Sequence, residues 1–333
     1  MTGLGGIVLT ARFARCEDPS HALGSRRAQE CGDPLAAAHR ASARLSNLQL
    51  FVACVAIWGS TWLAITFQLG VVAPEASVVY RFLLASLLLF AFCHARRLRL
   101  RFSPRDHAWI ALQGVLMFGA SYVFVYHAEQ HLVSGLVAVG YSASPLLGML
   151  GLRLFFGTPM TARVATGSVL GITGIALVFA PEFADFKSTD RPVLGVVLTA
   201  LSVILSALGS MAAHRNHDSA IPVWQAMAWG MLYGAIFVAI WTVAAGRSFA
   251  FNPAPSYVLS LLYLAVFGSI LAFGSYLTLL GRIGAARAGY TGVVIPIVAL
   301  AISAAFEGLH WQALTWTGVA VSLVGNVLVL RRA

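Results

Sequence analysis

The sequence predicts an all-α membrane protein with ten transmembrane helices, arranged as two inverted five-helix repeats. Its 333 residues are 59% hydrophobic and only 10% charged, with a mean hydropathy of +0.81, whereas soluble domains carry roughly 25% charged residues. Apolar stretches of the ~20 residues that cross a bilayer recur along the chain. Basic residues gather in every second connection, and several glycine and proline positions repeat after 151 residues.

Residues 1–46 precede the first long apolar stretch, and we predict that they form a disordered cytoplasmic tail. This segment is polar and contains six arginines. Its apolar run Leu4–Thr10 is too short and too rich in glycine for a signal-peptide core. The basic residues also follow that run instead of preceding it, which argues against a signal peptide.

Ten apolar stretches follow this tail, separated by short connections. We expect five of them in each repeat, with the first repeat at 47–181 and the second at 192–332. The predicted spans are 48–68, 75–94, 107–127, 132–152, 163–181, 192–212, 222–244, 257–280, 286–306 and 312–330.

Basic residues are distributed unevenly between the two sets of alternate connections. Of the 22 arginines and lysines, 18 fall in the set that includes both termini and three in the other set. Positive charge accumulates in the cytoplasmic loops of membrane proteins, so we expect both termini in the cytoplasm. The net charge of +10 therefore reflects topology. We expect no nucleic-acid partner, which would require a soluble basic domain with interleaved aromatic residues.

The two halves share a pattern of glycine and proline. Because each half has an odd number of spans, the second half enters the membrane from the other side and the repeat is inverted. Inverted repeats are typical of transporters, whose halves alternately open a central site to each side. A shift of 151 residues pairs Pro145 with Pro296, Gly157 with Gly308, Gly167 with Gly318 and Gly174 with Gly325.

The same residue types predict close helix contacts and a cavity wall. Gly167–Gly171 and Gly230–Gly234 have the Gly-x-x-x-Gly spacing that lets helix backbones approach closely. Pro145 and Pro296 would each open a helix near its middle, and the carbonyl groups that they free must face protein or water. The helices that carry these prolines are therefore candidate walls of a cavity.

Arg81 lies well inside a predicted span, whereas the other arginines lie in connections or at span ends. It follows Pro74 by seven residues, about 10 Å along a helix at 1.5 Å per residue. A charge within hydrocarbon costs at least ~2.5–3.5 kcal/mol, so its position requires a reason. Either Arg81 binds a substrate carboxylate in a water-filled cavity, or it is structural, paired with Glu75 or with free carbonyl groups at a helix end.

Aromatic and hydroxyl side chains are the other candidates for substrate binding. Those of the first span fall at i, i+4 and i+8, which places them on one helical stripe, and the two tyrosines of the third span also share a face. Such residues either stack against a substrate, or pack against neighbouring helices or form an interfacial aromatic belt. The candidates are Trp58, Trp62, Thr66, Tyr122, Tyr126 and Tyr290.

Three titratable residues near span ends are candidates for proton coupling, namely His127, Glu129 and Glu307. Histidine titrates near neutral pH, and the two carboxylates lie close to the predicted membrane boundary. The alternatives are an interfacial position for His127 and Glu129, and a role for Glu307 in capping the turn at Gly308.

No motif indicates catalysis, a metal or a cofactor. The chain lacks the G-x-x-x-x-G-K, H-E-x-x-H and G-x-S-x-G sequences, which weakens ATP-driven, protease and hydrolase interpretations. Its four cysteines are scattered, without C-x-x-C or His–Cys spacing. We therefore expect a non-enzyme that binds neither metal nor cofactor.

The chain resembles EamA-type proteins of the drug/metabolite transporter superfamily over residues 47–332. The first-half motifs that carry the resemblance are Trp58–Ile65, Pro74, Arg81–Ala85, Ala128–Gln130, Ser134–Ala138 and Ser144–Leu146. Those of the second half are Pro296, Phe306–Gly308, Gly318 and Gly325–Asn326. One position departs from the family pattern: Thr158 stands where the first repeat usually has a glutamate, whereas Glu307 is kept in the second.

The resemblance implies two EamA repeats with cytoplasmic termini and a secondary carrier of the plasma (inner) membrane. Members of the family move amino acids, other metabolites or toxic organic compounds, often outward, and Arg81 occupies a recurring arginine position. We therefore expect an exporter of a small organic metabolite, working by alternating access in the lipid bilayer, with proton coupling and a homodimer both open. The alternatives are a membrane-embedded enzyme acting on lipid and a non-transporting scaffold, which a structure without a cavity at Arg81 and Trp58 would favour.

Overall fold

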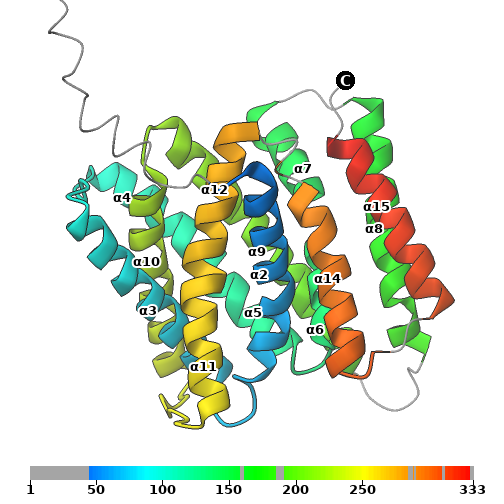
Figure 1. The fold of residues 1–333 in the computed structure, drawn as a ribbon, viewed down its shortest axis with the longest axis horizontal. Coiled ribbons are helices and arrows are strands. Elements are labelled where there is room, and N and C mark those ends of the chain that lie inside the picture. Colours follow the sequence, from blue (N-terminus) through cyan, green and yellow to red (C-terminus); the bar gives the residue numbers. More distant parts are fainter. Residues whose placement is uncertain are drawn as a thin grey trace, which may run out of the picture. The chain divides into compact units, whose positions relative to one another are not determined.

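The computed structural model describes residues 45–157, 161–184, 191–283, 288, 290–309 and 312–330. Within these ranges the chain is helical and contains no β-strand (Figure 1). Residues 1–44, which make up most of the predicted tail, and Thr158 lie outside the described residues.

The helices pack side by side as a bundle (Figure 1). Two of the segments, η1 and η2, are π-helical. In chain order the elements are α2 (Asn47–Thr66), α3 (Pro74–Ala95), α4 (Pro104–Gly114), η1 (Val115–Ala120), α5 (Ser121–Ala128), α6 (Ser134–Tyr141), α7 (Ser144–Phe156), α8 (Ala162–Ala184), α9 (Arg191–Asp218), α10 (Val223–Ala244), α11 (Pro255–Tyr263), η2 (Leu264–Leu271), α12 (Ala272–Ile283), α14 (Tyr290–Phe306) and α15 (Ala313–Leu330).

Eight helical stretches of the described chain are long and apolar enough to cross a membrane, and α14 is a shorter apolar helix of 17 residues. The predicted fourth span, 132–152, is not continuous, because α6 ends at Tyr141 and α7 begins at Ser144. Proline lacks an N–H, so Pro145 cannot donate a hydrogen bond to the carbonyl group of Tyr141, four residues earlier. Pro145 therefore accounts for the break, whereas Pro296 lies inside an unbroken α14.

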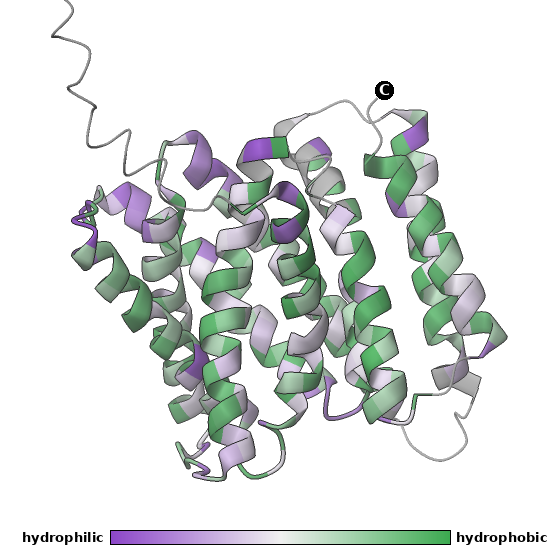
Figure 2. Ribbon diagram, viewed as in Figure 1, coloured by the Kyte–Doolittle hydropathy of each residue, from purple (hydrophilic) through white to green (hydrophobic). Residues whose placement is uncertain are grey.

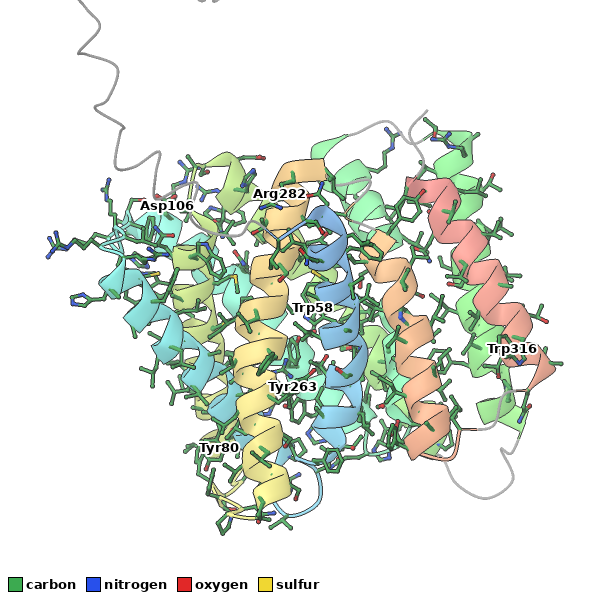
Figure 3. All side chains as sticks on the ribbon, viewed as in Figure 1. Trp58, Tyr80, Asp106, Tyr263, Arg282 and Trp316 are labelled. Carbon is green, nitrogen blue, oxygen red and sulfur yellow. The ribbon has the colours of Figure 1, made fainter. Side chains whose placement is uncertain are left out.

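Polar residues gather at the two ends of the bundle, and apolar residues cover its sides (Figure 2). Large apolar side chains point outward as lipid-facing residues do; Leu154, Ile240 and Phe306 are at least 64% exposed. We call one end the basic end, since it carries the α3–α4 connection and the last turns of α9 and α12, with Arg215 and Arg282. Figure 3 labels Arg282 at this end and Tyr80 near the opposite end.

Helices α8 and α15 lie side by side, joined by glycine contacts (Figure 1). A Cβ atom added at Gly167 would lie 2.7 Å from the carbonyl oxygen of Gly325, and one at Gly318 would lie 2.6 Å from that of Gly174. The 151-residue shift maps Gly167 on Gly318 and Gly174 on Gly325. Exchange of the two halves therefore turns each of these contacts into the other. An interface on a two-fold axis has this property.

Helix α10 approaches the first half in the same way. A Cβ atom at Gly114 would lie 2.1 Å from the carbonyl oxygen of Gly230, and one at Gly234 would lie 2.7 Å from that of Gly114. The prediction that Gly230 and Gly234 lie at a close helix contact is thereby confirmed.

The π-helical segments occupy corresponding places in the two halves. Segment η1 (Val115–Ala120) interrupts the third candidate span and η2 (Leu264–Leu271) interrupts Pro255–Tyr276. A shift of about 150 residues superimposes them. π-Helical turns inside α-helices are rare and often occur at functional sites.

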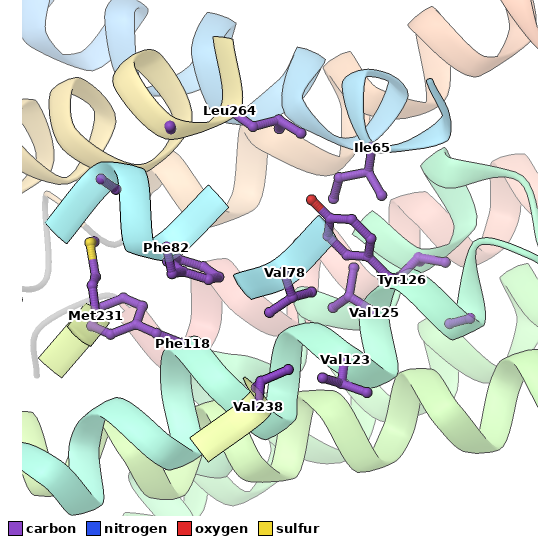
Figure 4. Close-up of a cluster of buried hydrophobic side chains, with 14 of the residues drawn as sticks. Ile65, Val78, Phe82, Phe118, Val123, Val125, Tyr126, Met231, Val238 and Leu264 are labelled. Carbon is purple, nitrogen blue, oxygen red and sulfur yellow. The ribbon is translucent and has the colours of Figure 1, made fainter. Parts of the chain in front are cut away.

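A buried cluster of apolar side chains holds the centre of the bundle together (Figure 4). Phe82 of α3 is fully buried, and its ring lies 5.5 Å from that of Phe118 and 4.8 Å from that of Tyr122. Edge-to-face and tilted aromatic pairs at such distances are favourable. This packing fixes the first turns of α3 against η1 and α5, and thereby positions the neighbouring Arg81.

Candidate functional site

A cavity of about 250 Å³ lies inside the bundle and is lined by both halves of the chain. The first half contributes residues of α2, α3, η1, α5, α6 and α7, and the second half contributes residues of α9, α12 and α14. Its volume is below the ~300–1,000 Å³ of pockets for drug-sized ligands. The cavity contains both Arg81 and Trp58, so the condition that would favour a non-transporting scaffold is not met.

Arg81 is the charged residue of this cavity and is 1% exposed. Its Nε donates a hydrogen bond to Ser269 Oγ at 3.2 Å, and its guanidinium carbon lies 4.6 Å from the centre of the Tyr122 ring. Arg81 forms no ion pair with a carboxylate of the described residues. Glu75, the alternative partner that we considered, pairs instead with His127 at 2.9 Å.

Segment η2 shapes the place that the guanidinium occupies. Ser269 Oγ donates to the carbonyl oxygen of Leu264, five residues earlier, a separation that corresponds to the π-helical turn. A Cβ atom on Gly268 would lie 2.8 Å from Thr61 Cγ2 and 3.4 Å from Arg81 Nη2. The glycine therefore lets η2 approach α2 and α3 closely enough for Ser269 to reach Arg81.

Three buried donors on the cavity wall lack hydrogen-bond partners in the described chain. They are Arg81 Nη1, Trp62 Nε1 and Ser144 Oγ. A buried donor left unsatisfied costs about 1–3 kcal/mol, and more when it is charged. No Asp or Glu is among the described residues that line the cavity. The wall is therefore suited to a ligand that brings acceptor atoms and negative charge.

Aromatic rings form the apolar part of the wall. The Trp62 ring lies 5.1 Å from that of Tyr141, and the Trp58 ring lies 5.0 Å from that of Phe273. Trp58 Nε1 donates to the carbonyl oxygen of Gly268 at 3.1 Å, which fixes this ring against η2. Figure 3 labels Trp58 about midway between the two ends of the bundle. An apolar or planar ligand body fits such a surface.

The wall also offers an acceptor. Pro296 has no N–H, so the carbonyl group of Gly292, four residues earlier in α14, lacks its usual helical donor. Both residues line the cavity, and no heavy atom lies within 4 Å of the place where a Gly292 Cβ atom would stand. The expectation that a helix with one of these prolines forms a cavity wall is met for Pro296.

At the opposite end the bundle is closed by polar contacts between α6 and α14. Glu307 accepts hydrogen bonds from the backbone N–H of Ser134 at 3.2 Å and from the hydroxyl groups of Ser134 and Ser303. Ser303 Oγ also accepts from the N–H of Gly135 at 2.8 Å. We call this group the Glu307 clasp. It satisfies N–H groups of the first turn of α6.

The profile of the EamA-like transporter family matches the chain twice, at residues 45–180 and 193–331. The chain belongs to this family. The prediction from its motifs is thereby confirmed, and the molecule is a multi-pass membrane transporter of the drug/metabolite type. Both repeats of this family therefore line the central cavity of the bundle.

Several relatives of this EamA-family protein are named as transporters. It is 31% identical over 276 residues to the uncharacterized inner membrane transporter YedA of Escherichia coli, covering 82% of this chain and 87% of that one. It is 24% identical to a probable terminal-alkyne amino-acid exporter of Streptantibioticus cattleyicolor, covering 84% and 92%. One crystal structure shares the fold with a TM-score of 0.63 at 16% identity, covering 84% of this chain and 94% of that one.

Four of the predicted substrate-binding residues of this EamA-family protein line the cavity, namely Arg81, Trp58, Trp62 and Tyr122. The other three are not among its lining residues. The Thr66 hydroxyl donates to the carbonyl oxygen of Leu63, and the Tyr126 hydroxyl donates to Gln68 Oε1 at 2.9 Å. Tyr290 is half-buried in the first turn of α14.

The three candidate coupling residues all lie at the opposite end, in different surroundings. His127 pairs with Glu75 beside a separate, polar cavity of about 470 Å³ that Arg247 also lines. Glu307 is held in its clasp. Glu129 follows α5, and neither of its carboxylate oxygens has a hydrogen-bond partner in the described chain.

Sequence reasoning missed Ser269, which contacts Arg81. It also missed several residues of the wall, among them Tyr141, Ser144, Ser206, Ser210 and Phe273. Ser144 carries a signal that could have been used, because it precedes Pro145 at a predicted helix opening. No such sequence signal exists for Ser269, because the direction of its side chain depends on the π-helical turn of η2.

Proposed function

We propose that this protein is a secondary transporter that exports a small organic carboxylate, such as an apolar amino acid, across the inner membrane. The observation that carries the proposal is the cavity in which Arg81 Nη1 and two neighbouring donors have no partner. Arginine binds carboxylates through paired, charge-assisted hydrogen bonds. The aromatic rings would hold the apolar part of the substrate, and the free carbonyl group of Gly292 could accept from an ammonium group.

Alternating access of two inverted five-helix repeats is the mechanism that we propose. The exchanged glycine contacts of α8 with α15 and the corresponding places of η1 and η2 support a two-fold relation between the halves. Transporters with inverted repeats bind substrate between the repeats and open to each side in turn. The lining of the cavity by both halves agrees with this arrangement.

The conformation described here is, on this proposal, the one closed at the opposite end. The Glu307 clasp joins α6 to α14 there, and the Tyr257 and Ser77 hydroxyl groups lie 2.9 Å apart. From Arg81 the cavity wall continues toward the basic end through Ser206 and Ser210. Substrate would therefore enter from the basic end. On this proposal that end faces the cytoplasm together with both termini, which the distribution of arginine supports.

The names of the relatives support a transporter of the inner membrane, and one of them supports an amino acid as substrate. A lipid-acting enzyme would need titratable groups gathered at one depth. The described lining of the cavity offers only Arg81, Tyr122 and Tyr141 of that kind, so transport is the better explanation of the cavity.

Transport by the purified full-length protein in proteoliposomes tests the proposal. Counterflow of a panel of radiolabelled amino acids and of phenylacetate is compared with that of phenylacetamide, which has the same ring but no carboxylate. We expect exchange of at least one carboxylate and none of the amide. Absence of exchange for every carboxylate, with folding verified by size-exclusion chromatography, would overturn the proposal.

A further inference from the structure

The side chain of Glu129 stands apart from the other buried carboxylates of the opposite end. It is 7% exposed, and both of its oxygens are buried without a hydrogen-bond partner among the described residues. Glu75 has His127 as a partner at 2.9 Å. The carboxylate of Glu307 has three donors. A buried carboxylate without donors is far more stable in its protonated, neutral form.

The groups that interact electrostatically with Glu129 come from three parts of the bundle. Arg81 lies on α3, Tyr126 on α5 and Glu307 just beyond α14, and each interacts electrostatically with it. On its own segment the titratable neighbours are His127, which pairs with Glu75, and His131. The negative charge of Glu307 disfavours a second negative charge at Glu129, whereas the positive charge of Arg81 favours it.

Glu129 is the first residue beyond the third candidate span, Pro104–Ala128. Burial and the neighbouring Glu307 raise the pKa of this carboxyl well above its usual range, and Arg81 only partly opposes them. The geometry and the charges thus agree that the side chain carries a proton when Glu307 is ionised.

Arg81 links this carboxyl to the cavity. Its guanidinium group offers five donors, of which Nε is used by Ser269 and Nη1 by no described residue. An ionised Glu129 would offset the positive charge that attracts an anion into the cavity. A protonated Glu129 leaves that charge available.

Each of the three charged residues has an apolar residue at the corresponding position of the other half. The 151-residue shift maps Arg81 on Leu232, Glu129 on Leu280 and Glu307 on Phe156. The fold of a repeat therefore does not require these charges, since the corresponding positions of the second and first halves are apolar.

We infer that Glu129 is a proton-binding site whose occupancy is linked to the charge of Arg81, so that a proton and an anionic substrate bind together. The inference rests on the proposed function in taking Arg81 as the anchor of the substrate. Linkage is reciprocal: a proton on Glu129 favours the anion at Arg81, and the anion favours the proton. Substrate and proton would then move in the same direction.

Infrared difference spectroscopy of the full-length protein in lipid nanodiscs, titrated with pH and without substrate, tests the site. We expect a protonated carboxyl band at neutral pH that is lost in Glu129→Gln. It should persist in Glu75→Gln, the matched control, in which another buried carboxylate of the same end is replaced. Absence of such a band in the wild type, or its persistence in Glu129→Gln, would overturn the inference.

The link to Arg81 is tested in the same titration. Arg81→Gln should raise the midpoint of the Glu129 band by about one pH unit or more, because an opposing positive charge is removed. Arg81→Lys, which keeps the charge and guards against a folding defect, should leave the midpoint close to that of the wild type. Equal midpoints in the wild type and Arg81→Gln would overturn the link. No transport is measured, so failure here is distinct from failure of the proposed function.

Discussion

The carboxylate of Glu307 accepts a hydrogen bond from the backbone N–H of Ser134 at 3.2 Å, across 173 residues of sequence. This contact joins the residue that follows α14 to the first turn of α6 at the end of the bundle opposite the basic end. The positions that correspond to Ser134, Ser303 and Glu307 in the other half are Ala285, Leu152 and Phe156. The residue types of the Glu307 clasp therefore occur in only one of the two corresponding sets of positions.

Loss of the Glu307 clasp should open the cavity toward that end. We expect Glu307→Gln to increase labelling of Ala138→Cys, a cavity residue, by a membrane-impermeant maleimide applied from the opposite end in a background without native cysteines. Hydrogen bonds to charged groups are worth about 1.5–3 kcal/mol, so labelling should rise about tenfold or more. Thr166→Ala, which removes an exposed hydroxyl on α8, serves as control. Unchanged labelling in Glu307→Gln would show that the clasp is not a gate.

Arg81 should be indispensable for carboxylate transport. Arg81→Ala removes the charge and the donors, and we expect counterflow of carboxylates to be abolished. Arg81→Lys should retain part of it if charge alone matters, because lysine offers a point charge in place of a bidentate fork. Initial rates in proteoliposomes measure this. Normal transport by Arg81→Ala would remove the residue from the site.

Restoring a backbone donor to α14 should discriminate between substrates. Pro296→Ala supplies an N–H that can bond to the carbonyl of Gly292, so that carbonyl is no longer free for a ligand. Binding of phenylalanine, which carries an ammonium group, should weaken by about 1.5–3 kcal/mol, whereas binding of phenylacetate should not. Calorimetric titration of both ligands provides the comparison, and equal losses would argue against an ammonium contact there.

The raised pKa of Glu129 gives binding of phenylacetate a defined dependence on pH. Below that pKa the carboxyl is protonated and affinity should be constant. Above it, affinity should fall up to tenfold per pH unit, because the ionised carboxylate opposes the anion. Glu129→Gln should bind phenylacetate with an affinity that does not change over the same interval. A wild-type profile retained in Glu129→Gln would assign the dependence to another group.

Enlarging a glycine between α8 and α15 should destabilise the protein. Gly174→Val places a side chain where a Cβ atom alone would lie 2.3 Å from the backbone nitrogen of Ser322, and overpacking costs about 1–3 kcal/mol. Gly292→Ala, at a site with no heavy atom within 4 Å, should leave thermal stability unchanged or higher. Melting temperatures in detergent compare the two variants, and an unaffected Gly174→Val would contradict the close contact.

The parts of this molecule that follow from charge and hydropathy could be predicted from the sequence. Arg81 was found because a lone charge in an apolar stretch requires a cavity or a partner. Trp58 and Trp62 were found because helical spacing places them on one face. Helix boundaries were predicted within a few residues for most spans.

The remaining features depend on local geometry that residue type does not specify. Ser269 reaches Arg81 only through the π-helical turn of η2. Tyr126 shares a face with Tyr122 but lies one turn nearer the helix end. There its hydroxyl group donates a hydrogen bond to Gln68. The interruption between α6 and α7 was missed because hydropathy remains high across Pro145, so the apolar stretch alone gave no sign of it.

The glycine contacts between α8 and α15 have a consequence for motion within the bundle. Exchange of the two halves turns this set of contacts into itself. The backbones of α8 and α15 are also so close that neither helix can slide unless the two first separate. A conformational change that interchanges the roles of the two halves leaves this pair as it is. The remaining helices, which include all those that line the cavity, would then move relative to a fixed pair at one side of the molecule.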